Sequence, residues 1–350
     1  MNPSISRQGR QKIFAWVVLG CIVLAVGYTL RVILRADASA SHVQTGSQGT
    51  PLSIAGVNEL EAIQSQPHLL FVNLKRPDIA QVRLAGLDTP FPGRAQTELT
   101  CERIHYAAGN GICLMYDTSG LAPLVSVTLF GSDFKPRYEF STEGILSRAR
   151  VSPDGRYAAF TVFLTGHSYN DANMSTATFL LDTATGTNLG NLEEFETWKD
   201  GHLYKAPEFN FWGVTFAQDS NRFYVTLRHD KTTYLMQGDV AARKLTVLHE
   251  NVECPSLSPD GTRIAFKKST STFLWQLTVL DLATMKEIPL AERESIDDQV
   301  EWLDNEHILY QKIDYDYDPP EWVSVFVLPA DGSGKPEVLM PNALSPVVVR

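Results

Sequence analysis

Aspartate alternates with tyrosine in the stretch DYDYD, residues 314–318. Carboxylates at every second position are typical of calcium-binding loops, because Ca²⁺ prefers several oxygen ligands. A twelve-residue calcium loop between two helices also needs glycine at its sixth position and glutamate at its twelfth, where this chain has Pro319 and Val325. We therefore interpret Asp314 and Asp316 as part of an acidic surface loop. Calcium in another geometry is a secondary hypothesis, and no other cofactor is expected.

The remaining patterns that could support catalysis are incomplete. GHSYN, residues 166–170, lacks the closing glycine of a nucleophile turn, and DGSGK, residues 331–335, is too short to wrap a phosphate. His167 and His202 are of a type that serves as base or metal ligand, but neither has a partner at a recognisable spacing. The sequence therefore predicts no catalytic residue and no metal site.

Charge is distributed unevenly along the 350 residues. The first 35 positions hold five basic and no acidic residues, whereas the whole chain has 40 acidic and 30 basic ones. The rest of the chain is therefore strongly acidic and would repel a phosphate backbone. Nucleic acid is excluded as an expected partner.

An uncharged run of 18 residues, 13–30, approaches the length that spans a bilayer. Aromatic residues near its ends and basic residues before it favour a single-pass anchor, with the N-terminus inside and the body outside the cytoplasm; they are Trp16, Tyr28, Arg7, Arg10 and Lys12. We predict a cytoplasmic segment 1–12, an anchor or signal-anchor 13–35 and a flexible tether 36–56. Cleavage after Ala40, within the small-residue sequence ASA, is the alternative and would make the body secreted.

Three cysteines lie beyond the apolar run, so at most one disulfide can form within the chain. A hairpin turn at Gly109 and Asn110 would set Cys113 opposite Tyr106. Cys101 would then lie five residues further along, about 16 Å away at the rise of a strand. A regular hairpin cannot bridge Cys101 and Cys113, and their disulfide requires the chain to fold back at Cys101.

The elements that position these residues follow from a repeat. The chain contains nearly the same sequence motif twice, RVSPDGRYAAF at 150–160 and LSPDGTRIAF at 257–266. In each copy a tight turn joins a short first strand to a second strand in which apolar and polar residues alternate. Weaker copies begin near residues 103, 213 and 299, and two more strands follow each hairpin. Units of 40 to 45 residues with four strands are typical of propeller blades.

These units predict an all-β fold, a six-bladed β-propeller of four-stranded blades over residues 57–350. Five units are complete, and the sixth is assembled from both ends of the body. LLFVNL at 69–74 lacks a first strand, and LSPVVV at 344–349 lacks the later ones. Pairing them closes the ring and removes an exposed sheet edge.

The phrases SPDGRYAAF, SPDGTRIAF, LLDTATG and VLDLATM resemble the WD-type repeats of the TolB propeller family over roughly residues 69–349. The resemblance implies the propeller fold. TolB carries an α/β domain before its propeller, whereas this chain has a tether there. Longer phrases such as NFWGVTFAQD resemble exported TolB-like proteins of uncertain function, so the resemblance implies no activity.

Long loops are expected on one face of the propeller. The turns between the first and second strands of each blade are short, whereas the elaborated loops join second to third strands or one blade to the next. Loops on a rigid scaffold often carry function. We therefore predict a ligand- or partner-binding face that includes His167, Ser168, Tyr169, Trp198, His202, Tyr204, Asp297, Asp298, Asp314 and Asp316.

Acidic residues dominate this predicted face, which favours a basic partner, either an envelope protein or a small ligand. The sequence as a whole indicates a membrane-anchored, extracytoplasmic interaction module without catalytic activity. A propeller hydrolase or lyase with its site at the mouth of the channel is the alternative.

Overall fold

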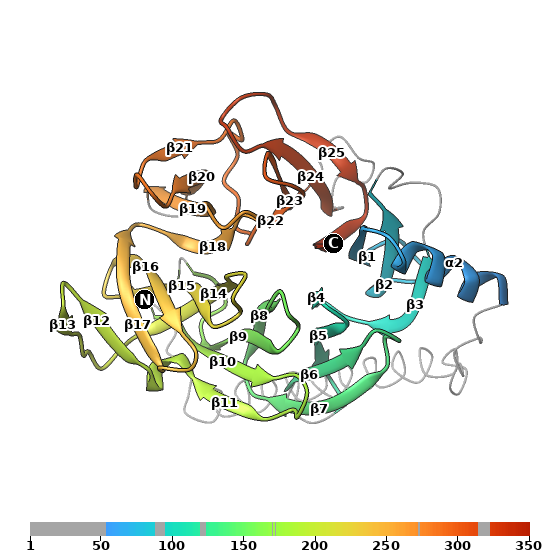
Figure 1. The fold of residues 1–350 in the computed structure, drawn as a ribbon, viewed down its shortest axis with the longest axis horizontal. Helices are drawn as coiled ribbons and strands as arrows, with labels where there is room; N and C mark the ends of the chain where they lie inside the picture. The colour runs from blue at the N-terminus through green and yellow to red at the C-terminus, as the bar shows by residue number, and fades with distance from the viewer. Residues whose placement is uncertain are drawn as a thin grey trace, which may run out of the picture. The chain divides into compact units, whose positions relative to one another are not determined.

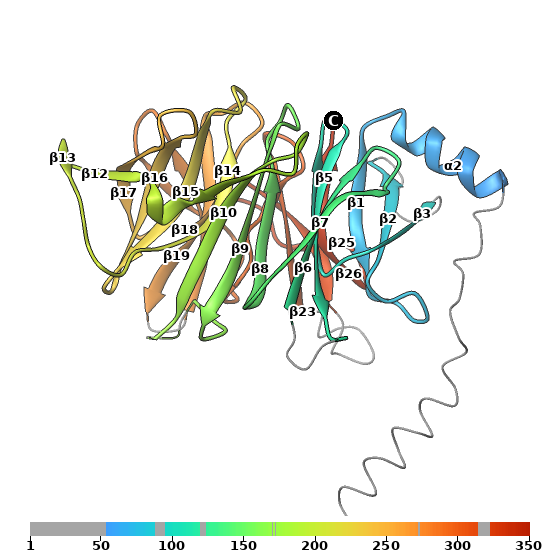
Figure 2. The ribbon, with the colours of Figure 1, turned by 90° about the horizontal axis from the view of Figure 1, so that it is seen from below.

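A computed structural model describes residues 54–87, 95–119, 124–169, 171, 173–271, 274–313 and 323–350. These residues belong to one compact unit in which six sheets stand around a central axis (Figure 1). Seen from the side, the strands of each sheet run side by side through the thickness of the ring (Figure 2). The predicted all-β, six-bladed propeller is confirmed.

The first three blades have four strands each, and Figure 1 shows the first-named strand of each blade nearest the axis. Blade 1 consists of β26 (Ala343–Val349), β1 (His68–Asn73), β2 (Gln81–Gly86) and β3 (Ala95–Thr100). Blade 2 consists of β4 (Arg103–Ala107), β5 (Asn110–Asp117), β6 (Leu124–Gly131) and β7 (Pro136–Thr142). Blade 3 consists of β8 (Ile145–Val151), β9 (Tyr157–Thr165), β10 (Ser175–Asp182) and β11 (Asn188–Asn191).

The last three blades follow in chain order. Blade 4 consists of β14 (Asn210–Phe216), β15 (Arg222–His229), β16 (Thr232–Asp239) and β17 (Lys244–Glu250). Blade 5 consists of β18 (Glu253–Leu257), β19 (Arg263–Ser271), β20 (Leu274–Asp281) and β21 (Glu287–Pro289). Blade 6 consists of β22 (Glu301–Trp302), β23 (His307–Ile313), β24 (Val323–Pro329) and β25 (Glu337–Met340).

Blade 4 carries two additional strands, which differ from the predicted loop. After the short 3-10 helix η1 (Leu192–Glu194), strand β12 (Glu196–Lys199) pairs in parallel with β17, and β13 (His202–Leu203) pairs with β12. This sheet therefore has six strands. Strand β12 satisfies backbone groups along the outer edge of β17, an edge that would otherwise be open.

The repeated SPDG phrase forms the same turn twice. Ser152 Oγ donates to Asp154 Oδ1 at 2.7 Å and accepts the Tyr157 amide at 2.9 Å, and Gly155 has a φ of +75°. Ser258 Oγ makes the corresponding bonds to Asp260 Oδ1 and the Arg263 amide at 2.6 and 3.0 Å. Because Gly155 accepts the left-handed conformation, the chain reverses directly from the innermost strand into the next.

The core consists of apolar clusters shared between neighbouring blades. One cluster, for example, joins Leu114 and Val127 of blade 2 to Val151 and Phe160 of blade 3, and all four side chains are buried. Each blade therefore covers the apolar face of the next. The ring consequently has to close for every blade to be covered on both sides.

Closure occurs between β26 and β1, as the sequence predicts. The two strands are antiparallel, and Val347 pairs with Leu70. Both side chains are buried in the same cluster as Val82 and Leu84 of the next strand. The last strand of the chain is thus the innermost strand of the first blade.

Helix α2 (Ile54–Gln64) precedes blade 1 and overlaps the end of the predicted tether. Leu60 and Ile63 pack against the apolar cluster of blade 1, and Gln64 Nε2 donates to the Ser132 carbonyl at 2.8 Å. The predicted anchor, residues 13–35, lies outside the described residues. Within the part that is described, no helix combines the length and the apolar character needed to cross a membrane.

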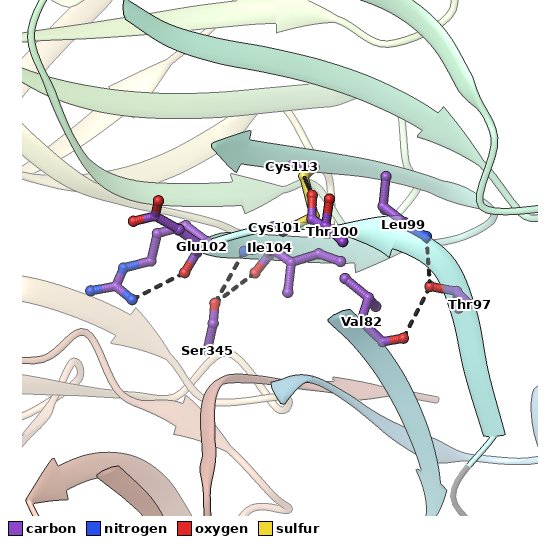
Figure 3. Close-up of a disulfide and its surroundings, with 10 residues drawn as sticks. Val82, Thr97, Leu99, Thr100, Cys101, Glu102, Ile104, Cys113 and Ser345 are labelled. Atoms are coloured by element: carbon purple, nitrogen blue, oxygen red, sulfur yellow. Dashed lines mark hydrogen bonds between the residues drawn. A yellow bond between two sulfur atoms is a disulfide. The ribbon is translucent and has the colours of Figure 1, made fainter. Parts of the chain in front are cut away.

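Cys101 and Cys113 form a disulfide, with their Cα atoms 5.5 Å apart (Figure 3). The predicted hairpin register is wrong: Cys113 lies opposite Ile104 because the turn occurs at residues 108 and 109. The chain bends at Cys101, whose amide donates to the Ala80 carbonyl. This is the folded-back arrangement that the bridge requires, and it ties the end of blade 1 to β5 of blade 2.

Candidate functional site in the central channel

The innermost strands present polar side chains to the axis of the ring. His105 of β4, Arg150 of β8, Ser256 of β18 and Glu301 of β22 all line one hollow at the axis. Successive side chains in a strand point to opposite sides, so every second residue of an innermost strand can face the channel. The channel is therefore a charged interior surrounded by apolar blades.

A hollow of about 270 Å³ opens at one end of this channel. Its rim is formed by the turns that follow the innermost strands, including Pro153, Gln218 and Pro259. Phe216 and Trp302 lie behind the wall, where they are buried. We call this hollow the channel mouth; it lies on the face opposite the predicted long-loop face, because the strands of a blade alternate in direction.

The inner end of the mouth is closed by an ion pair. The Arg150 guanidinium contacts Glu301 Oε2, and it also donates to Ser256 Oγ at 3.2 Å and to the Val300 carbonyl at 2.7 Å. Burial alone would raise the pKa of Glu301, but Arg150 and His105 together hold that pKa at about 2. Glu301 is therefore charged at neutral pH.

His105 is held in one tautomer beside this pair. Its Nδ1 accepts the Val151 amide at 3.0 Å, so Nε2 carries the proton and faces Glu301 Oε2 at 3.8 Å. Burial lowers the pKa of His105. Neither ring nitrogen of His105 is therefore available to take a proton from a substrate in the mouth.

A small cavity of about 30 Å³ lies further along the channel. His105 and Arg150 line both this cavity and the mouth, so they separate the two spaces. Arg103, Arg148 and Asp298 also line the cavity.

The opposite end of the channel is closed by a second set of ion pairs. Asp297 Oδ1 accepts from Lys267 Nζ at 2.5 Å and from Arg148 at 3.4 Å. Lys267 is fully buried, and its ammonium lies over the rings of Tyr169 and Trp275 at 4.8 and 4.1 Å. Burial alone would raise the pKa of Asp297, but Lys267 and Arg148 lower it.

The structure brings three of the predicted site residues together at this closed end, namely Tyr169, Asp297 and Asp298. Tyr169 is only 6% exposed and stacks on Trp212, and its hydroxyl shares a hydrogen bond of 2.5 Å with Ser147. Asp298 is also buried, and its carboxylate accepts the amides of Gln299 and Gln311. In this structure Tyr169 and Asp298 hold loops in place and offer little surface to a partner.

The other predicted site residues lie away from the channel. Trp198, His202 and Tyr204 belong to the added strands of blade 4 or directly follow them, far out on the rim (Figure 1). His202 and His167 are exposed, and Ser168 is half-buried. Asp314 and Asp316 lie outside the described residues.

Sequence reasoning missed the cations of the channel. Arg148, Arg150 and Lys267 are buried, and Arg103 is half-buried. A signal was present, because Arg148 and Arg150 alternate in a strand that a propeller places next to its axis. Among the described residues, no group of three or more His, Cys, Asp and Glu side chains is arranged to hold a metal ion.

No protein-family model matches this chain, and no curated protein sequence matches it either. Solved structures do resemble it. TolB from Acinetobacter baumannii superposes with a TM-score of 0.54 at 13% identity, over 81% of this chain and 66% of that one. A chain from a nidogen–laminin complex superposes with a TM-score of 0.53 at 10% identity, over 81% of this chain and 98% of that one.

The chain thus spans just under two thirds of that TolB chain. Identities this low establish the fold and leave activity and partners open. The blade count, the closure by the last strand and the superposition agree with one another. The protein is a six-bladed β-propeller with a TolB-like fold.

Proposed function

We propose that this propeller is an interaction module without catalytic activity, and that it binds a segment of a partner protein in the channel mouth. The observation that carries the proposal is the mouth itself, a hollow of about 270 Å³ with a partly apolar wall above a charged inner end. Protein interfaces typically combine buried aromatic anchors with a few oriented polar groups.

The inner end of the mouth supports binding over catalysis. Arg150 and Glu301 form an ion pair, and the ring nitrogens of His105 face Val151 and Glu301. A hydrolase or lyase would need a base with a free lone pair close to its substrate. The observation that favours an enzyme is the pair His105 and Glu301 beside the mouth. Because the hydrogen-bonding groups of this pair are already occupied, an enzyme is only the second candidate function.

A protein partner is favoured over a small solute by the shape of the mouth and by one structural resemblance. The rim consists of turns from several blades, so a protruding loop or peptide could contact many of them at once. One matched solved structure is a nidogen–laminin complex, an assembly between proteins. The prediction of a basic partner on the long-loop face stands beside this proposal. Of its ten residues, His167, His202 and Asp297 are exposed, and Asp314 and Asp316 lie outside the described residues.

The proposed location is outside the cytoplasm, with residues 13–30 as a membrane anchor. The Cys101–Cys113 disulfide supports this location, because disulfides persist in oxidising compartments such as the cell envelope. Digestion of intact cells with a protease should remove the body and leave a short membrane-bound fragment. Mature protein that begins at Ser41 would instead indicate cleavage and secretion.

Variants of the mouth test the binding proposal. Gln218→Trp fills the exposed rim, and Leu257→Lys places a charge in the wall; neither is a fully buried side chain. Both changes should weaken capture of the partner by at least tenfold when the purified body is incubated with a cell-envelope extract from its source organism. Leu203→Lys, at a 44% exposed position on the rim of blade 4, is the control and should leave capture unchanged.

The opposite pattern would contradict the proposal. If Leu203→Lys abolished capture while Gln218→Trp and Leu257→Lys retained it, the partner would bind the added strands of blade 4 and not the channel mouth. If no partner were captured and the body turned over compounds from a glycan or ester library in a way that Glu301→Gln abolished, the enzyme hypothesis would replace the binding hypothesis.

A further inference from the structure

The small cavity inside the channel contains more positive charge than its ion pairs use. Three arginines line it, Arg103, Arg148 and Arg150, and the single acidic residue that lines it is Asp298. Arg150 is paired with Glu301. Among the described residues, Arg103 has no carboxylate within ion-pairing distance, and its hydrogen bonds go to the carbonyls of Ser147 and Glu102.

Arg148 has few partners for a buried guanidinium. The residue is 8% exposed, and among the described residues its hydrogen bonds go only to Asp297, at 3.3 and 3.4 Å. Its Nε has no hydrogen-bond partner there, and neither does the Nε of Arg150, which is 7% exposed. Buried donors without acceptors are rare in folded proteins, and each one costs free energy.

Arg103 and Arg148 also repel each other. Burial lowers the pKa of Arg103, and the charge of Arg148 lowers it further, while Asp298 acts in the opposite direction. The Asp298 carboxylate is already engaged, because each of its oxygens accepts a backbone amide. A further negative charge between the two guanidinium groups would relieve this repulsion and supply the missing acceptor.

The volume of the cavity limits what can bind there. A site needs roughly 10–15 Å³ to hold one water, so about 30 Å³ accommodates one monatomic ion or two waters. Sulfate, phosphate and carboxylates of organic ligands are too large. His105 and Arg150 separate the cavity from the channel mouth, so an ion enters from solvent on this side when these two side chains move aside.

We propose that the channel binds a chloride ion in this cavity, between the guanidinium groups of Arg103, Arg148 and Arg150. The ion stabilises the packing of β4 against β8, the two innermost strands that carry these arginines. The site is separate from the proposed binding of a partner in the mouth, and it stands or falls independently.

Thermal unfolding of the purified body at constant ionic strength tests the proposal. Replacing gluconate with chloride should raise the Tm with the logarithm of the chloride concentration, by about 3 °C for each tenfold increase above the dissociation constant. Bromide should act similarly, whereas sulfate should give no response that depends on Arg148. Arg148→Met should abolish the response, whereas Arg156→Met, a change at an exposed arginine of the same hairpin, should retain it.

A second variant covers the case in which Arg148→Met does not fold. Asp298→Asn removes the negative charge that lines the cavity, so half-saturation should shift to a lower chloride concentration, by about tenfold. Crystals grown in bromide should show an anomalous peak in the cavity. An identical Tm in gluconate and chloride, an unchanged midpoint in Asp298→Asn, or a cavity that contains only water would each overturn the proposal.

Discussion

Glu301 is the side chain on which the inner end of the mouth depends. It is 12% exposed, it contacts the Arg150 guanidinium, and its pKa is about 2 in the folded protein against 4.5 for an ordinary glutamate. A folded-state pKa below the unfolded one means that the charged form stabilises the fold. This stabilisation is complete above about pH 5 and disappears as the pH falls towards 2.

We therefore expect Glu301→Gln to change the acid sensitivity of the protein. At neutral pH the variant leaves Arg150 buried without its partner, and it should lose about 3 kcal/mol of unfolding free energy. The difference from the wild type should shrink as the pH falls from 5 to 2, because the wild-type carboxylate becomes protonated. Urea denaturation at a series of pH values measures this, and a difference that is constant with pH would contradict it.

Prediction from sequence was weakest at this scale of single residues. Tyr169 and Asp298 were expected on a binding surface because they are an aromatic residue and an acid in long loops. The structure buries both: Arg148 and Lys267 lie over the Tyr169 ring, and the Asp298 carboxylate accepts two backbone amides. A sequence pattern shows which residues lie in loops, but burial depends on contacts between blades that no local pattern records.

At the scale of elements, the sequence predicted the hairpins of the blades well, but it did not predict the helix and strands that lie outside the repeated blade pattern. The SPDG turns carry their own hydrogen bonds and a glycine, so local chemistry determines them. Helix α2 and strands β12 and β13 were missed. Strand β12 is four residues long and depends on pairing with β17, so its structure arises from tertiary contact.

The disulfide between β5 and the end of β3 is the element-level feature with the clearest energetic consequence. It closes a short loop, with a sequence separation of 12, and cross-links of this kind contribute about 3 kcal/mol. The double change Cys101→Ser and Cys113→Ser should lower the unfolding free energy by about 2–4 kcal/mol. Scanning calorimetry with and without reductant measures the loss.

Cys254→Ser is the matched control for the disulfide, because Cys254 is a buried cysteine outside the bridge. Reductant should lower the Tm of the wild type and of Cys254→Ser, and it should have no effect on the double variant. If reductant destabilised the double variant as much as the wild type, the cross-link would not be the source of the stability.

At the scale of the whole molecule, the repeat spacing and the two incomplete ends were sufficient to predict the closed ring. The blades begin close to the predicted positions, and β26 pairs with β1. This scale is the most predictable because every blade contributes to the same pattern. A single misjudged loop therefore leaves the blade count unchanged.

Breaking the closure should affect the entire ring. Val347→Asp places a carboxylate in the buried cluster beside Leu70, and it should cost about 3 kcal/mol or more. It should also release the edge of β1 and promote association. Val338→Asp, at a 47% exposed position in β25, should do neither. Denaturation and size-exclusion chromatography distinguish these results, and equal effects of the two changes would contradict the proposed role of closure.

The pairing of the last strand with the first also determines when the protein can finish folding. Strand β1 is synthesised early, but its pairing strand β26, in which Val347 lies opposite Leu70, is synthesised roughly 280 residues later. At a translation rate of 5–20 residues per second, the inner edge of β1 stays unpaired for about 15–55 s. During this interval a nascent chain has an unsatisfied strand at its leading end, so the cell's holding chaperones have a defined window in which to protect it.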